Sequence, residues 1–505
     1  MTLFRQAKDC SLPRGAALLA AGTAALLAGC APVPRLGVAP PPLAQAGTAA
    51  TQSLAPTVGA PSAWPGEGWW QAYGDPQLDA LVAEGLSAAP DIALAQARLD
   101  RAAALARSAG AARLPQAEAQ AGVQQEKQSL NLGFPPSFKP VLPQGWNDGG
   151  QITASLGFDL DLWGRNRAAL AAATSQRRAA ALDLQQARLL LSVAIVSAYV
   201  DLDRLVAERD IRAAQVRSLE QTGEIADQRV ENGLENIAST AQARGAVALA
   251  RIALSQAEES EALRRSQIAA LVGAGPDRGL ALRRPALSAV TVRGIPATAT
   301  TELVARRPDV AAARERVAAG ASSMREARAG FFPSLSLNAL FGVQSLGLER
   351  LFEADSTYGR VGPAVSLPIF RGGALAARYR GARADYDAAV ASYNATVLGA
   401  YRETADAVTA TRLVTERLAQ ARAAAAASEE ALATVTARYK AGLVSYLDVL
   451  QVDDRRLDAR LTLAAIEAAA RGADLALVRA LGGGFSSATA TATAPMTAMK
   501  DTPHG

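Results

Sequence analysis

The chain contains one unit twice, and this duplication restricts its fold more than any other feature. Residues 89–115 recur as residues 307–333 at a constant offset, and residues 229–234 recur as residues 438–443 at a slightly smaller offset. Two copies are too few for a solenoid, which usually needs three or more units to bury a continuous core. The duplication therefore predicts pseudo-symmetry within a closed assembly.

The amino terminus has the pattern of a secretory signal peptide over residues 1–29. Arg5 and Lys8 precede a short uncharged apolar run that ends in Leu-Ala-Gly-Cys at Cys30. This run is too short to cross a bilayer as a helix. Its ending resembles the lipobox of bacterial lipoproteins, which implies that Cys30 becomes the acylated, palmitate-bearing first residue of the mature protein. A Pro-rich tether over residues 30–65 would follow, and the alternative is an ordinary signal peptide with an incidental cysteine.

Composition excludes several function classes. The single histidine, His504, lies in a Ser/Thr/Ala-rich tail over residues 485–505 that we expect to be disordered, and Cys10 would leave with the signal peptide. Most metal sites and nucleophilic triads therefore lack a member. We expect no cofactor, no metal and no enzyme activity, although carboxylate-only catalysis stays open. The net charge of +5 is modest and its basic residues are dispersed, so nucleic acid is not an expected partner.

Two long helices are predicted, one in each half. Residues 167–232 and 374–440 contain no proline, and in the first of them apolar residues recur at spacings of three and four. Each run would extend for about 100 Å at ~1.5 Å per residue. Gly233 and Gly442 then mark chain reversals. A shorter helix is expected to return after each reversal, over residues 237–271 and 446–481.

Four segments between the helices have the period-two alternation or polar small-residue composition of strands. They are expected near residues 116–125, 150–162, 333–341 and 362–370. About ten residues is the length of a tilted membrane-spanning strand, and no mature segment is apolar enough for a membrane-spanning helix. Four strands cannot close a barrel, so a membrane sheet would need several copies, and three would supply twelve strands. A lipoprotein with two exposed hairpins on a helical stalk is the alternative.

Four segments carry a resemblance to a known family. They are residues 69–81, residues 89–91 (Ala-Pro-Asp), residues 306–310 (Arg-Arg-Pro-Asp-Val) and residues 330–335 (Gly-Phe-Phe-Pro-Ser-Leu). The chain resembles the TolC-like outer membrane factors, in their NodT-type lipoprotein branch, over nearly the whole mature length. The resemblance implies a mainly α fold with a small β membrane part. It also implies a homotrimer in which a 12-stranded β-barrel continues into a 12-helix periplasmic α-barrel.

The same resemblance divides the chain and places its site residues. The repeats would cover residues 66–284 and 285–484, each with a helix, two strands and a helical hairpin. Asp448 and Gln451 would ring the periplasmic aperture, where carboxylates attract cations. Gly233 and Gly442 would mark the adaptor-contacting hairpin turns. The other interpretation of Asp448 is a solvated helix residue.

A charged lock between the two hairpins is not supported by the sequence. The first-half counterpart of the aperture motif reads Ala-Ser-Thr over residues 238–240, without an acidic group. Arg229 and Arg438 fit ordinary charges that favour a helix C-terminus.

We therefore expect a passive outer-membrane exit channel of a tripartite, RND-type efflux pump. Its partners would be a periplasmic adaptor, an inner-membrane transporter and outer-membrane lipid, and it would extend from the outer membrane into the periplasm. Two alternatives stay open. One is a type I secretion channel, and the other is a periplasmic coiled-coil adaptor or structural lipoprotein. The exported substrate is not indicated by the sequence.

Overall fold

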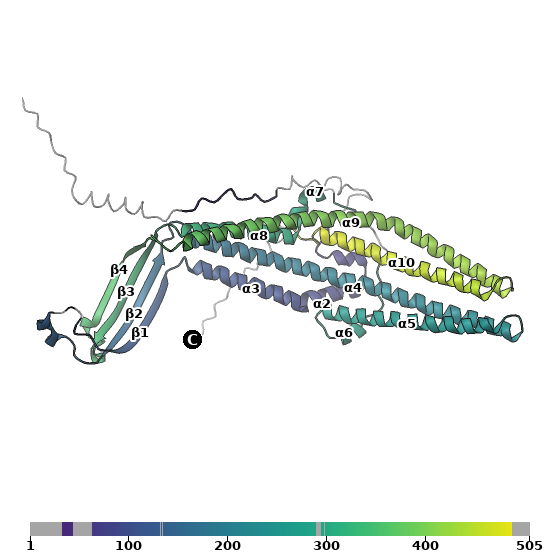
Figure 1. Ribbon diagram of the computed structural model, residues 1–505, viewed down its shortest axis with the longest axis horizontal. Helices are drawn as coiled ribbons and strands as arrows, with labels where there is room; N and C mark the ends of the chain where they lie inside the picture. The colour runs from purple at the N-terminus through teal and green to yellow at the C-terminus, as the bar shows by residue number, and fades with distance from the viewer. Residues whose placement is uncertain are drawn as a thin grey trace, which may run out of the picture. The chain divides into compact units, whose positions relative to one another are not determined.

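The computed structural model describes residues 33–43, 63–131, 133, 135–288, 294–296 and 298–486 (Figure 1). The predicted signal peptide, Cys30 and nearly all of the predicted disordered tail lie outside these residues. The contacts divide the chain into two compact units. The first unit holds the described residues up to 41 together with residues 101–177 and 315–390, and the second holds residues 42–100, 178–314 and 391–486.

A single four-stranded antiparallel sheet lies in the first unit (Figure 1). The strands are β1 (Gln116–Glu126), β2 (Asn147–Asp159), β3 (Ser334–Leu346) and β4 (Thr357–Ser366), in the order β1-β2-β3-β4. Each repeat contributes one hairpin, and the pairing of β2 with β3 joins the two repeats, for example at Ala154 opposite Phe341. The predicted chain with four strands and a helical majority is confirmed.

The end of β2 differs from the expected position because of helix capping. The alternating pattern suggested a strand to residue 162, but β2 ends at Asp159. Asp161 adopts a φ of 47°, and its carboxylate accepts hydrogen bonds from the N–H groups of Asn166 (2.9 Å) and Arg167 (3.0 Å) in the first turn of the next helix. The capping geometry therefore competes with the strand and ends it early. β4 also ends before the expected residue 370. Its last residue is Ser366, two residues before Pro368.

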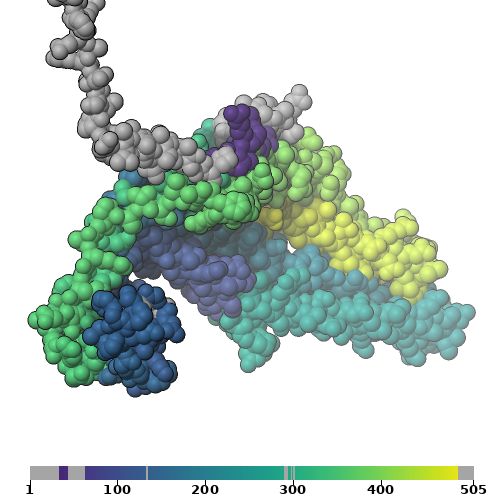
Figure 2. Space-filling view, turned by 60° about the vertical axis from the view of Figure 1, so that its left-hand side comes forward, coloured from purple at the N-terminus to yellow at the C-terminus, as the bar shows by residue number. Residues whose placement is uncertain are grey.

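The helices preserve the duplication in their lengths. α4 (Arg165–Glu231) and α9 (Ala374–Lys440) both have 67 residues. α5 (Ile237–Leu271) and α10 (Tyr446–Ala480) both have 35 residues, so each half forms a hairpin with the same dimensions. Within the second unit the two hairpins lie side by side, the first coloured blue to teal and the second green to yellow (Figures 1 and 2). None of the described helices is both long and apolar enough to cross a membrane.

The two short helices of the repeats, α3 (Pro90–Ala111) and α8 (Pro308–Ala329), have the same length but different burial. No residue of α3 is buried within the chain. In α8, by contrast, Val310 is 1% exposed and Ala312 is 0% exposed. The chain therefore covers one repeat's short helix and leaves the equivalent helix of the other repeat open.

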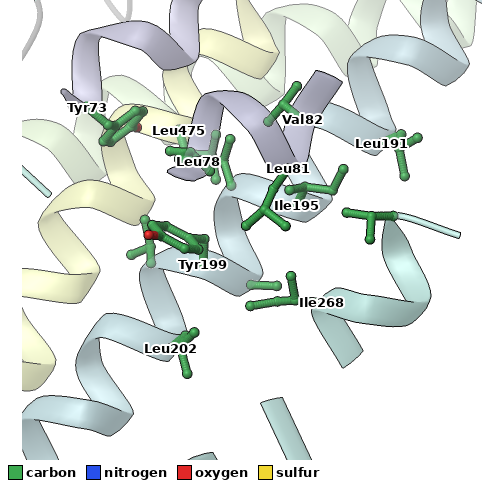
Figure 3. Close-up of a cluster of buried hydrophobic side chains, with 14 of the residues drawn as sticks. Tyr73, Leu78, Leu81, Val82, Leu191, Ile195, Tyr199, Leu202, Ile268 and Leu475 are labelled. Atoms are coloured by element: carbon green, nitrogen blue, oxygen red, sulfur yellow. The ribbon is translucent and has the colours of Figure 1, made fainter. Parts of the chain in front are cut away.

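Short elements complete the chain. They are η2 (Trp69–Tyr73), α2 (Pro76–Ala88), η3 (Pro136–Val141), α6 (Asp277–Leu280), α7 (Ala299–Glu302), η4 (Leu303–Arg306), η5 (Leu348–Arg350) and η6 (Ala354–Ser356). Of these, α2 anchors the main hydrophobic core of the second unit. Leu78 and Leu81 of α2 are fully buried against Ile195 of α4 and Ile268 of α5 (Figure 3). This apolar contact fixes α2 onto the long helices α4 and α5.

A buried hydrogen-bond cluster at the start of α2 supports this core. The Asp75 carboxylate caps the helix by accepting from the N–H of Gln77 (2.9 Å), and it also accepts from the Tyr199 hydroxyl (2.6 Å) and the N–H of Ala286 (2.8 Å). Burial opposes ionisation of Asp75, but these hydrogen bonds outweigh it and lower the pKa of the carboxyl. Asp75 is therefore held as a carboxylate that joins three segments of the second unit.

We expect Leu81→Ala to lower the free energy of unfolding by about 2–5 kcal/mol, because it opens a cavity in a fully packed core. Leu263→Ala is the matched control, since Leu263 lies on α5 and is 65% exposed. Chemical denaturation of the two variants, followed by circular dichroism in detergent, measures the difference. Equal stability losses would show that the α2 contact is not a main core contact.

Candidate functional site

The sheet has one continuous apolar face. Alternate residues of a strand share a face, and residues paired across strands lie on the same side. The register therefore groups one set of apolar side chains across all four strands. They are Ala117, Ala119, Ala121 and Val123 of β1, Ile152, Ala154, Leu156 and Phe158 of β2, Leu335, Leu337, Ala339, Phe341 and Val343 of β3, and Val361, Pro363 and Val365 of β4. Large members are exposed, with Phe341 at 67% and Val361 at 76%.

The opposite face of the sheet is mainly polar. It carries Gln116, Glu118, Gln120, Gln124 and Glu126 of β1, Gln151, Thr153 and Ser155 of β2, Ser336, Asn338 and Gln344 of β3, and Tyr358 and Arg360 of β4. Leu340 is the main apolar exception. An uncovered apolar face is costly in water, whereas strands with one apolar and one polar face suit a boundary between lipid and an aqueous lumen.

The far ends of the two helical hairpins turn through matching glycines. Gly233 has a φ of 69° and Gly442 a φ of 77°, in the left-handed region that other residues adopt only with strain. In each turn the glycine N–H and the next N–H donate back to carbonyls of the preceding helix. Gly442 donates to Tyr439 (2.9 Å) and Leu443 to Arg438 (3.0 Å), which is the Schellman pattern. The predicted reversals therefore use the conformation that glycine allows.

An aromatic cluster joins the ends of the two hairpins. Tyr439 of α9 is 0% exposed, and its ring centroid lies 5.8 Å from that of Tyr446 in α10. Both rings belong to an apolar cluster that also includes Ala226 of α4 and Ala243 of α5. Small residues on the first hairpin thus make room for large aromatic side chains on the second. The contact packs the two hairpin ends against each other within one chain.

A polar network lies beside this cluster and crosses from one hairpin to the other. The Glu235 carboxylate accepts from the Tyr439 hydroxyl (2.8 Å) and the Ser239 hydroxyl (2.9 Å), and forms an ion pair with Arg229 (3.0 Å). Arg229 also donates to the Tyr439 carbonyl (3.4 Å), and its guanidinium lies 5.2 Å from the centre of the Tyr439 ring. Arg229 is therefore more than a charge at a helix end.

The network sets the ionisation of its members. Burial opposes ionisation of Glu235, but hydrogen bonds from Tyr439, Ser239 and Arg229 outweigh it and lower the pKa of the carboxyl. Burial, together with the hydrogen bond to Glu235, raises the pKa of Tyr439. Tyr439 thus stays a neutral donor to a carboxylate. The sequence argument missed this network because Glu235 lies in the turn itself, three residues before the segment compared with the aperture motif.

Asp448 and Gln451 lie on exposed positions of the first turns of α10. Asp448 forms a capping box, since its carboxylate accepts from the N–H (2.8 Å) and the hydroxyl (2.7 Å) of Ser445. These two hydrogen bonds lower the pKa of the Asp448 carboxyl. Asp448 is therefore held as an exposed carboxylate at a helix start. Its role, and that of Gln451, at an aperture stays a prediction.

The next acidic residue on α10 points into the hairpin. Asp453 is 2% exposed and forms an ion pair with Arg456 (2.7 Å), which also lies near Glu429 of α9 (3.6 Å). Burial raises the pKa of Asp453, although the Arg456 charge and hydrogen bond oppose this rise. Asp453 therefore braces the α9–α10 hairpin and is not an exposed charge like Asp448.

Known proteins resemble this chain over most of its length. The family model described as outer membrane efflux protein matches residues 81–274 and 300–483, one match in each repeat. The solved outer membrane protein VceC from Vibrio cholerae is 38% identical, with a TM-score of 0.78, over 84% of this chain and 100% of that chain. This likeness confirms the predicted fold.

Two curated relatives give the same result. The multidrug resistance outer membrane protein MdtP from Escherichia coli K12 is 32% identical over 84% of this chain and 88% of its own length. The fusaric acid resistance protein FusA from Burkholderia cepacia is 35% identical over 64% of this chain, and the match spans only 60% of FusA. The chain therefore belongs to the outer membrane efflux protein family and acts in the outer membrane as an efflux channel.

Proposed function

We propose that three copies of this chain form the passive exit duct of a tripartite, RND-type pump. The two-faced sheet carries this proposal, because its apolar face suits lipid and its polar face suits a water-filled lumen. Three sheets supply twelve strands, more than the eight whose interior side chains fill a barrel. A periplasmic adaptor or a structural lipoprotein would leave the exposed apolar face without a role.

The proposed pump partners supply the energy that a passive duct lacks. A passive duct supplies no energy, so the driving force would come from an inner-membrane transporter, with a periplasmic adaptor between the two. The names of the relatives support small-molecule export, since they describe multidrug resistance and, in Pseudomonas putida, pyoverdine export. In this proposal Cys30 carries the lipid anchor, and the hairpin ends at Gly233 and Gly442 contact the adaptor.

The hairpin ends are the proposed gate. Within each copy, the Glu235 carboxylate and the Tyr439 hydroxyl hold the first hairpin to the second. Separation of the hairpins would break this hydrogen bond and the Arg229 contact to Tyr439 together. An opened duct must therefore offset their loss with new contacts, which an adaptor seated on the hairpin ends would supply.

We expect Tyr439→Phe to raise the conductance of the purified channel in a planar bilayer, because it removes the hydrogen bond to Glu235 and favours separated hairpins by about 1–3 kcal/mol. Tyr446→Phe is the matched control. It truncates a buried tyrosine of the same cluster whose hydroxyl has no hydrogen-bond partner within the described residues. Equal conductance of the two variants would refute the gating role, whereas no conductance from verified wild-type trimers would indicate a tightly closed resting state.

We expect Asp448→Asn to reduce the cation selectivity of the channel, because three exposed carboxylates would be lost at the aperture. Ser445→Ala separates this charge from helix capping, since it removes the Ser445 hydroxyl from the capping box and leaves the Asp448 charge in place. Reversal potentials measured under a salt gradient compare the two. If both variants shift the potential equally, or neither does, Asp448 is a capping residue only.

We expect Gly442→Val to reduce efflux in cells, because a β-branched residue at a φ of 77° strains the turn by about 1–2 kcal/mol or more. Gly472→Val serves as the control, since Gly472 lies within α10 and a Cβ there would have no atom of the described residues within 4 Å. Drug susceptibility at matched outer-membrane levels of the proteins gives the readout. Unchanged efflux in Gly442→Val would show that the turn geometry is not needed for transport.

A further inference from the structure

The sheet leaves two strands with an unpaired edge. Among the described residues, β1 pairs only with β2, and β4 pairs only with β3. Since three antiparallel steps separate them, β1 and β4 run in opposite directions. β4 of one copy can therefore form an antiparallel pair with β1 of the next copy. Pairing between copies rests on the proposed trimeric channel, because in hydrocarbon both edges must be paired.

The two edges are staggered along the strand direction. Thr357, the first residue of β4, lies in the same row of the sheet as Ala121 in the middle of β1. β4 therefore extends past the start of β1 at Gln116, and β1 extends past the start of β4 as far as Glu126. The neighbouring β1 can cover β4 only after a slide along the strand of about four to six residues.

The two faces of the sheet restrict this slide to an even number of residues. Side chains alternate between the faces, so an odd slide would place Arg360 of β4 opposite an apolar-face residue such as Val123. An even slide keeps Val361 beside apolar residues of β1 and Arg360 beside polar ones. Slides of about four and about six residues both satisfy this condition.

The tilt of the strands selects the longer slide. The tilt of the strands from the barrel axis depends on the total slide around the barrel divided by its circumference. With twelve strands and three seams, the tilt is about 34° if each seam slides by four residues and about 46° if each slides by six. β2 and β3 each have 13 residues. A strand of that length, about 43 Å, fits a hydrocarbon layer of about 30 Å when it is tilted by about 45°. At the smaller tilt it would span about 35 Å.

We propose that β4 of one copy pairs with β1 of the next so that Arg360 lies opposite Gln124 and Tyr358 lies opposite Glu126. The Arg360 side chain has no hydrogen bond or ion pair within the described part of the chain, and it lies on the polar face. In this register the Glu126 carboxylate of the neighbouring copy is diagonal to Arg360, within reach of its long side chain. The seam between copies then carries an ion pair on the lumen side.

Tyr358 completes the pairing. Its hydroxyl accepts a hydrogen bond from the Gln151 side chain (2.8 Å), which leaves the O–H free to donate to the facing Glu126. Each of the three seams would hold the same Arg360, Tyr358 and Glu126 group, with residues from both copies. Neither copy can form the group alone, so it specifies register as well as association.

Engineered disulfides test the register directly. We expect Arg360→Cys combined with Gln124→Cys to give covalently linked dimers and trimers on a denaturing gel, reversed by reductant, because directly opposed residues have the Cβ separation that a disulfide needs. Two control pairs combine Arg360→Cys with Gly122→Cys, for the slide of four, and with Glu118→Cys, for no slide. The natural cysteines, Cys10 and Cys30, lie outside the strands.

The outcomes separate the seam from the trimer. Preferential linkage of either control pair, or no linkage in intact trimers, overturns the proposed register. The mass of the complex in detergent, measured by light scattering, tests the trimer itself, and a monomer would refute both the register and the trimer.

As a second readout, Arg360→Glu should lower the temperature at which the trimer dissociates in detergent, and Glu126→Arg added to it should restore that temperature. Failure of the restoration would refute the ion pair.

Discussion

The need to pair every backbone hydrogen-bonding group in lipid is the constraint on which the rest of this molecule depends. Each chain supplies four strands and two unpaired edges, and neither edge can face hydrocarbon without a cost of several kcal/mol per group. That requirement turns a small sheet into a part of a larger one.

The two repeats have helices of the same lengths but different side chains at the hairpin ends. Long and short helices match in length between the repeats. At the hairpin ends, however, the position equivalent to Tyr439 is Val230, and the position equivalent to Glu235 is Val444. The hydrogen bond between Tyr439 and Glu235 therefore has no counterpart by symmetry. The two repeats therefore share the glycine turns, whereas this hydrogen bond runs from the second hairpin to the first and not in the reverse direction.

Much of the fold could be predicted from the sequence, because its signals are local. Proline-free runs predict the long helices, glycines with room for a positive φ predict the turns, and alternation predicts strands. The end of β2 could not be predicted from alternation, since Asp161 caps the following helix from within the alternating segment. The network at the hairpin ends was missed for a different reason. Glu235 and Tyr439 are far apart in sequence, and only the packing of two hairpins brings them together.

The open surface of α3 has a consequence for the life of the newly made protein. Its equivalent, α8, has several residues buried by its own chain, whereas no residue of α3 is fully buried and Ile92 is only partly buried against the main core. A helix with little tertiary support is a low-stability region that opens readily to proteases. Association of the proposed trimer depends on concentration, so a newly made copy would keep this surface exposed for longer when little of the protein is present.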